Sequence, residues 1–276
     1  MDHIGYNMGM NEETEIDRKW LTSFDFKYWI IPLLLTATLL ILWELLVWLF
    51  DIKEWLLPAP SSISQEMFES RELLFNHSLT TISEIVIGFL FSLAIGVCLA
   101  GAIAYSNVVE RFAYPFVIAS QTVPVIVIAP LLLIWIGYGM IPKIIVVILI
   151  SFFPIVVNTV DGLKSADRDT IRMLSTLGAS KWQIFVKLQI PYSIPFLFSG
   201  MRVAITLSVI GAVIGEWVGS SSGLGYLMMR SAPQFLTERV FASIVILSVI
   251  GIFLFSLIVI IERLYMPWYE MEKRQN

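Results

Sequence analysis

The sequence predicts an all-α protein that crosses a membrane several times. Of its 276 residues, 57% are hydrophobic and 14% are charged, and its mean hydropathy is +0.81. Soluble domains usually carry about 25% charged residues. Apolar runs of about 20 residues, the length that a membrane-spanning helix needs, recur along the chain. These runs are solidly apolar, whereas the strands of a membrane barrel alternate apolar and polar residues, so we expect helices.

Six apolar runs are predicted as membrane spans, because each is close to the length that crosses the hydrocarbon core. In chain order they are residues 29–50, 80–104, 112–136, 143–161, 195–217 and 240–264. The third run contains Pro124 and Pro130. A proline within a helix removes a backbone hydrogen bond and crowds the preceding turn, so we expect this span to be bent or broken.

The positions of lysine and arginine predict the orientation of the chain. These residues concentrate before the first run, in the segment 162–194 and after the last run. Membrane proteins carry an excess of positive charge on the cytoplasmic side. We therefore expect a cytoplasmic tail at residues 1–28, a transmembrane domain at 29–268 whose loop 162–194 is cytoplasmic, and a cytoplasmic tail at 269–276.

Two segments are then expected on the outer side. Residues 51–79 contain "LLPAPSSISQEMFES", in which a turn is followed by the apolar spacing of a helix lying at the membrane interface. Residues 218–239 contain "GSSSGLGYLMMRSAPQF", whose glycines permit tight turns.

The cytoplasmic segment contains the stretch "LGASKWQIFVKLQIPYSIP", residues 177–195. Ser180 and Gln183 have the spacing of a capping box, which predicts a helix start. Gly178 suits a sharp corner with positive φ before that helix. Pro191 is expected to end the helix, because proline cannot continue it. The stretch therefore predicts a glycine corner followed by a helix of about ten residues.

This short helix needs a surface to pack against, because a helix of about ten residues is not stable alone in water. Trp182, Phe185, Val186 and Gln189 fall on one of its faces. Three packing surfaces are possible for it. They are the rest of this chain, the lipid interface, where tryptophan and lysine are favoured, and a groove on a separate cytoplasmic protein.

The same stretch resembles the EAA loop of ABC-type import permeases, through the spacing of Gly178, Leu188, Ile190 and Pro191. Four further stretches are similar to the branch of these permeases that handles sulfonates, nitrate, taurine and thiamine precursors. They are "TVPVIVIAPLLLIWIGYG" (122–139), "FFPIVVNTVDGL" (152–163), "PFLFSGMRVAITLSVIGAVIGEW" (195–217) and "SSGLGYLM" (221–228). The resemblance covers nearly the whole chain from Trp43 onward.

The resemblance implies the fold of a type I ABC importer permease in the plasma membrane of a prokaryote, with both termini cytoplasmic. It implies a cytoplasmic ATPase subunit, an extracytoplasmic solute-binding protein and a second permease subunit, identical to the first, as partners. The residues expected to couple the permease to the ATPase are Gly178, Ala179, Ser180, Trp182, Phe185, Leu188 and Pro191.

One departure from the family pattern concerns the residues before the glycine corner. The family often has Glu-Ala-Ala there, and this chain has Arg172, Met173 and Leu174. Arginine replaces an acidic residue, so we expect the contacts with the ATPase to differ from those of other family members.

The chain itself is not expected to be an enzyme or to hold a cofactor. It lacks the G-x-x-x-x-G-K-[ST] loop that binds nucleotide phosphates, so ATP is expected to bind the partner subunit. His3, His77 and the single cysteine, Cys98, are far apart in the sequence, and no metal site is predicted.

Polar residues within the spans are candidates for a solute pathway, because ionisable groups in membrane helices are commonly functional. The candidates for the pathway or its gate are Gln121, Thr122, Asn158, Arg202 and Glu216. Hydrogen bonds or ion pairs between helices are the more common explanation of such residues. Both explanations also apply to Glu84, and Glu44 is a candidate for the seam of a dimer.

The stretches 215–235 and 262–269 are most similar to permeases for a hydroxymethylpyrimidine-type precursor of thiamine. Riboflavin, and aliphatic sulfonates, taurine or nitrate, are the alternative substrates within the same family. An ion-coupled secondary transporter is the alternative of another class, and it would show inverted repeats, which we do not recognise in this chain.

Overall fold

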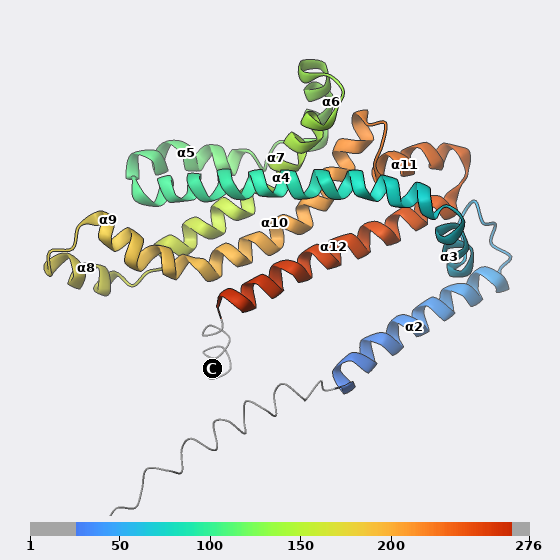
Figure 1. The fold of residues 1–276 in the computed structure, drawn as a ribbon, viewed down its shortest axis with the longest axis horizontal. Coiled ribbons are helices and arrows are strands. Elements are labelled where there is room, and N and C mark those ends of the chain that lie inside the picture. Colours follow the sequence, from blue (N-terminus) through green and yellow to red (C-terminus); the bar gives the residue numbers. More distant parts are fainter. Residues whose placement is uncertain (1–25, 267–276) are drawn as a thin grey trace, which may run out of the picture. The chain divides into compact units, whose positions relative to one another are not determined.

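The computed structural model describes residues 26–266, and every regular element in that range is a helix (Figure 1). The all-α prediction is therefore confirmed. The predicted tail 269–276 lies outside the described residues, and so does the predicted tail 1–28 except for its last three residues. The chain divides into two units, residues 1–62 and residues 63–276.

The first unit contains the first predicted span. Its helix α2 (Phe26–Leu49) is apolar, and residues 30–49 are long and apolar enough to cross a membrane. Glu44 on this helix accepts hydrogen bonds from the backbone nitrogen of Ser61 (3.0 Å) and from its hydroxyl group (2.6 Å). Ser61 is the second residue of α3 (Pro60–Glu69), so the carboxylate lies at a helix N-terminus, where a negative charge is stabilising.

Three long helices form the core of the second unit: α4 (Arg71–Tyr105), α7 (Met140–Lys164) and α10 (Ile190–Gly219). Glycines allow α7 and α10 to approach closely. A Cβ atom on Gly162 would lie 2.6 Å from the Cβ atom of Phe196, and one on Gly200 would lie 2.8 Å from the carbonyl oxygen of Pro154. Any larger residue at either position would force these two helices apart.

The third predicted span is broken, as its prolines predicted. It forms α5 (Asn107–Ala119) and α6 (Val125–Ile136), and Pro124 between them has extended backbone angles (φ −62°, ψ 114°). A helix of the length of α6 reaches about 18 Å, which is shorter than the hydrocarbon core. Among residues 26–266, five helices rather than six are therefore long enough to cross a membrane.

The second predicted span begins earlier than its hydropathy suggested. Helix α4 starts at Arg71 rather than at residue 80. Its first turns contain polar side chains that lower the hydropathy, but they bond within the helix: the hydroxyl group of Ser78 donates to the carbonyl oxygen of Leu74 (2.6 Å), and that of Ser83 to Leu79 (2.7 Å).

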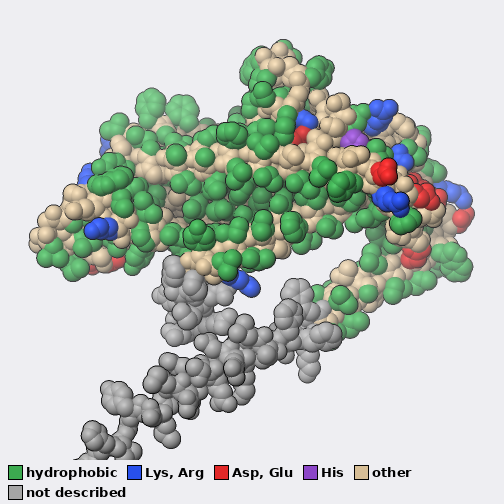
Figure 2. Space-filling view, in the orientation of Figure 1, with side chains coloured by type: hydrophobic (Ala, Val, Ile, Leu, Met, Phe, Trp, Pro, Cys, Tyr) green, Lys and Arg blue, Asp and Glu red, His purple; other side chains and the backbone are tan. Residues whose placement is uncertain are grey.

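The remaining helices of the second unit are α8 (Arg168–Thr176), α9 (Lys181–Ile184), α11 (Leu224–Ser231) and α12 (Thr237–Tyr265). A π-helical turn, η1 (Phe185–Gln189), joins α9 to α10, and a 3₁₀ turn, η2 (Ala232–Gln234), follows α11. Hydrophobic side chains cover the visible face over α4, α10 and α12, as expected of a surface that meets lipid (Figure 2).

Candidate functional site

The corner between α8 and α9 is made by Gly178, which has a φ of +87°. Its backbone nitrogen donates to the carbonyl oxygen of Ser175 (3.1 Å), and that of Ala179 donates to Leu174 (3.0 Å). A Cβ atom at position 178 would meet nothing within 4 Å. The requirement for glycine therefore comes from the backbone angle and not from crowding.

Both short helices at this corner begin with a side-chain cap. The hydroxyl oxygen of Ser180 accepts from the backbone nitrogen of Gln183 (3.3 Å), and the side-chain Oε1 of Gln183 accepts from the backbone nitrogen of Ser180 (2.8 Å). The predicted capping box is thus confirmed. Asp167 caps α8, because its carboxylate accepts from the hydroxyl group (2.7 Å) and the backbone nitrogen (2.9 Å) of Thr170.

These hydrogen bonds to Thr170, with a weaker one from Asp169, hold the pKa of Asp167 below its usual range. Our sequence analysis missed this cap. The sequence does contain the signal for it. Aspartate is a favoured N-cap residue, and Asp167 directly precedes the helical stretch that forms α8.

The expected helix end at Pro191 is wrong. Helix α9 runs through η1 into α10, and residues 181–219 form one helical segment. In η1 the backbone nitrogen of Ile190 donates to the carbonyl oxygen of Phe185, five residues earlier. This wider turn lets the helix continue into α10 although Pro191, the second residue of α10, has no N–H group to donate.

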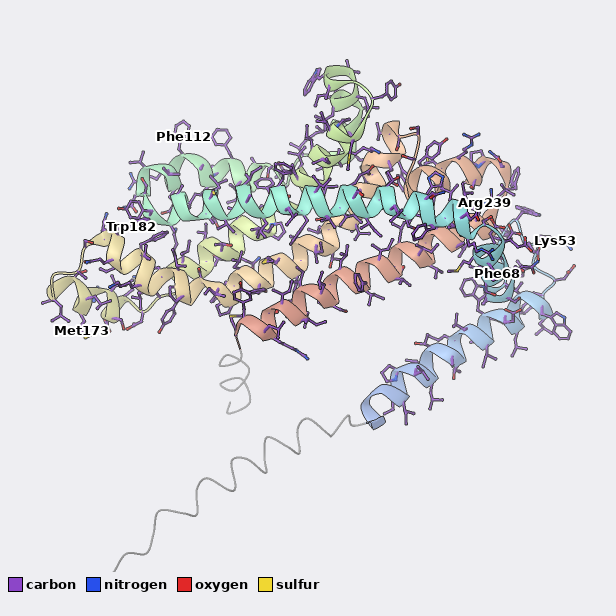
Figure 3. All side chains as sticks on the ribbon, viewed as in Figure 1. Lys53, Phe68, Phe112, Met173, Trp182 and Arg239 are labelled. Atoms are coloured by element: carbon purple, nitrogen blue, oxygen red, sulfur yellow. The ribbon has the colours of Figure 1, made fainter. Side chains whose placement is uncertain are left out.

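Three aromatic rings meet where α9 lies against the end of α4. The ring of Phe185 contacts that of Tyr105 edge to face (5.5 Å between centroids) and stacks on that of Trp182 (5.9 Å). Phe185 is 8% exposed, whereas Trp182 is 60% exposed and lies at the α9 end of the unit (Figure 3). The Trp182 ring also contacts Tyr105 edge to face (6.0 Å), so both expected aromatic anchors touch the chain itself, and only Trp182 keeps a large exposed surface.

The other coupling candidates differ in their exposure. Ala179 and Leu188 are half-buried, and Gly178, Ser180 and Pro191 are exposed. The exposed surface of this segment is therefore made by the corner at Gly178, by Ser180 and by residues 181–183 of α9.

At the opposite end of α10, Glu216 is almost completely buried and holds the loop between α10 and α11. Its carboxylate accepts from the hydroxyl group of Thr81 (2.6 Å) and from the backbone nitrogen of Gly225 (2.5 Å). Thr81 in turn accepts from the nitrogen of Leu224 (2.9 Å), and Nδ1 of His77 accepts from the nitrogen of Gly223 (2.9 Å). Two residues of α4 and one of α10 thus fasten this loop.

Lys143 of α7 joins the same cluster. Its ammonium group makes an ion pair with Glu84 of α4 and donates to the hydroxyl group of Ser220 (3.0 Å). The internal ion pair that was one of the two explanations for Glu84 is therefore present. Sequence analysis did not find Lys143, because it lies at the edge of an apolar run and only packing brings α4, α7 and α10 together.

The remaining pathway candidates have separate partners. Thr122 lies with Gln121 in the exposed turn between α5 and α6, and its hydroxyl group donates to the carbonyl oxygen of Ala119 (2.7 Å). The Asn158 amide donates to Pro154 of its own helix (2.8 Å).

Arg202 makes an ion pair with Glu262 (3.4 Å) and lines a pocket of about 390 Å³ between α10 and α12. Within residues 26–266, no ion pair or side-chain hydrogen bond joins two of the five pathway candidates. Nor do the described histidine, cysteine and acidic residues form a group of three or more that could hold a metal ion. His3 lies outside the described range.

Comparison with known proteins identifies the family. Residues 92–266 match the family described as binding-protein-dependent transport system inner membrane component. The chain is 40% identical over 238 residues to the formylaminopyrimidine transport permease protein ThiX of Halalkalibacterium halodurans, which covers 86% of this chain and 95% of that protein.

Two other relatives are named for different substrates. The riboflavin transport system permease protein RibX of Chloroflexus aurantiacus is 34% identical over 83% of this chain and 87% of its own length. The putative aliphatic sulfonates transport permease protein SsuC of Bacillus subtilis is 30% identical over 87% of this chain and 88% of its own length.

A solved structure of an amino acid ABC transporter with histidines has the same fold. Its TM-score is 0.56 at 17% sequence identity, and the match covers 73% of this chain and 96% of that one. The family match and the 40% identity to a named permease agree with each other: the chain belongs to the inner membrane components of binding-protein-dependent transport systems, the permeases of ABC transporters.

Proposed function

We propose that this permease imports a pyrimidine precursor of thiamine, of the hydroxymethylpyrimidine type, in an ATP-driven system. The observation that carries the substrate is the 40% identity to a formylaminopyrimidine permease along 95% of that protein. The riboflavin and sulfonate permeases are less similar, at 34% and 30% identity. Riboflavin, and then sulfonate, taurine or nitrate, are the alternatives.

The energy for import is supplied by a separate ATPase subunit, because the sequence lacks a phosphate-binding loop. The segment α8–α9 transmits this energy and lies on the cytoplasmic side with both termini. Its support is geometric: Gly178 fixes the corner, Ser180 caps α9, and the exposed ring of Trp182 is the kind of aromatic anchor that fills a partner's groove.

Arg172 makes this ATPase contact specific. Its side chain is 78% exposed on α8 and lies 3.4 Å from the carboxylate of Asp169, which is 86% exposed. Exposed pairs of this kind are weak, so the guanidinium group is free to meet an acidic group of the ATPase. An ATPase whose basic surface is complementary to permeases with Glu-Ala-Ala would therefore not bind this permease in place of its own ATPase subunit.

The end of the unit that carries the loop 219–225 faces the extracytoplasmic binding protein. A pocket of about 350 Å³ there is lined by His77, Tyr226 and Arg230, among others, and offers polar atoms to a docking surface. Two copies of the permease form the passage, as the resemblance of the sequence to ABC import permeases implies. An ion-coupled transporter would need neither this docking end nor the capped segment α8–α9.

The test is to purify the cognate binding protein from cells and identify its bound small molecule by mass spectrometry. We expect an aminopyrimidine of the thiamine-precursor type. If riboflavin or a sulfonate is found instead, the proposed substrate is wrong but the transporter class stands. Uptake that continues without ATP hydrolysis and follows an ion gradient would contradict the class itself.

A further inference from the structure

The helix that contains Trp182 changes its hydrogen-bond pattern at η1 (Phe185–Gln189). The donation from Ile190 to Phe185 spans five residues instead of four, which defines a π-helical turn. Such a turn adds one residue to an α-helix and is frequent at functional sites. Because η1 lies between α9 and α10, it sets the orientation of α9 around the axis of α10.

The buried residues of α10 reveal what the extra residue changes. They recur at helical spacing: Ser193, Phe198, Gly200, Met201, Ala204, Ile205, Ser208, Gly211, Ala212, Gly215 and Glu216. Continued back from Ser193, this spacing would reach Val186 and Trp182. Val186 is 38% exposed and Trp182 is 60% exposed. The buried residues are instead Ile184 and Phe185, at 7% and 8% exposed, so the buried stripe is displaced by one residue.

Pro191 accounts for the turn. In a regular α-helix its ring would collide with the carbonyl group of Lys187, four residues earlier, and it has no N–H group to donate. The π-helical turn ends at Gln189, two residues before the proline. A wider turn at this point relieves the collision and needs no hydrogen bond from position 191.

We propose that Pro191 and the π-helical turn act together as a register device that keeps the Trp182 ring at the exposed edge of its contact with Tyr105, where the ATPase reaches it. The proposal rests on the proposed function, in which α9 meets that subunit. In a regular α-helix the same sequence would rotate α9 by about 100°. That rotation carries Trp182 into the buried stripe and moves Phe185 away from Tyr105.

The test compares two forms of the permease, Pro191→Ala and Pro191→Ala that also lacks Lys187. Removing the proline permits a regular α-helix, which turns Trp182 inward. Deleting one residue from that regular helix should turn the Trp182 side chain outward again. We expect the tagged Pro191→Ala permease to retain about ten-fold less cognate ATPase than the wild type, and the deletion to restore retention to within about two-fold.

Two results would overturn the register device. One is undiminished ATPase retention by Pro191→Ala. The other is a loss that the deletion does not restore, because the proline would then act through something other than register. The amount of each variant in the membrane is measured alongside, so that a loss of protein is not mistaken for a loss of contact.

The rotation is also measured without the ATPase, which separates this inference from the proposed function. Cysteine is placed at Trp182 or at Phe185 in a Cys98→Ala background, and the purified protein is labelled with a soluble maleimide. With Pro191 present, we expect position 182 to react about ten-fold faster than position 185, because exposed thiols react faster than buried ones. In the Pro191→Ala background the order reverses; an unchanged order contradicts the inference even if the ATPase binds.

Discussion

Lys143 of α7 and Glu84 of α4 form an ion pair in which the two side chains are 7% and 0% exposed. Glu216 of α10 lies in electrostatic contact with both groups and is 1% exposed. The ammonium group of Lys143 therefore faces two carboxyl groups from two other helices. A buried charge without a partner is far more costly than the intact pair. The stability lost on substitution should therefore differ among the three members of this cluster.

Lys143→Met should destabilise the permease by about 3–5 kcal/mol, because it leaves the carboxyl groups without a cation. Glu84→Gln is the matched control and should cost far less, because Lys143 then still faces Glu216. Thermal unfolding of the purified variants in detergent measures both effects. Equal destabilisation by the two variants would contradict the account of the cluster.

Trp182→Ala and Phe185→Ala should affect different properties, although the two rings stack on each other. Trp182 is exposed, so its loss should weaken binding of the ATPase by about 2 kcal/mol, or roughly 30-fold, and leave permease stability unchanged. Phe185 is buried against Tyr105, so its loss should destabilise the permease by about 3 kcal/mol.

Co-purification with the ATPase and thermal unfolding, applied to both variants, separate the two roles. If Trp182→Ala leaves ATPase binding unchanged, the ring lies in the lipid interface instead.

Substitutions at Gly178 should follow the backbone angle and not the size of the side chain. Asparagine tolerates a positive φ better than valine does, and a side chain there meets no neighbour within 4 Å. We expect Gly178→Asn to retain most ATPase binding and Gly178→Val to lose most of it, with both proteins inserted in the membrane. Loss of equal size in both variants would mean that the space beside Gly178 is filled by the partner.

Protonation of Asp167 should loosen the start of α8. Hydrogen bonds from Thr170 hold its pKa below the ordinary value of 3.8, so its stabilising effect is complete above that value and is lost as the pH falls further. Hydrogen exchange of the Thr170 amide should therefore lose its protection at pH values below 3.8. In Asp167→Asn, a neutral cap, the protection should not depend on pH in this range.

The local features of the coupling segment could be predicted from the sequence, because each depends on residues close together in the chain. The capping box of Ser180 and Gln183 and the corner at Gly178 are such features. The end of the helix at Pro191 was predicted wrongly, because the rule assumes a regular α-helix. A π-helical turn removes the collision on which that rule depends.

The polar cluster could not be predicted, because its members lie far apart in the sequence. Glu84, Lys143 and Glu216 meet only when α4, α7 and α10 pack together, and hydropathy assigned each residue to the edge of a separate run. Similarly, the Glu262 partner of Arg202 lies on the last helix. An apolar run predicts that a helix is buried in a membrane but not which helix lies beside it.

The central claim is that the α8–α9 segment meets a nucleotide-hydrolysing subunit. The direct measurement is cross-linking in intact cells with Lys181→Cys in a Cys98→Ala background and a short thiol-to-amine reagent; position 181 is exposed beside Trp182, and the substitution leaves the Trp182 ring in place. The account predicts a cross-linked product that contains the permease and the ATPase, and none from a cysteine at Arg230, which lies in α11 beyond the other end of α10. A permease that imports its substrate but never cross-links from position 181 would contradict the account.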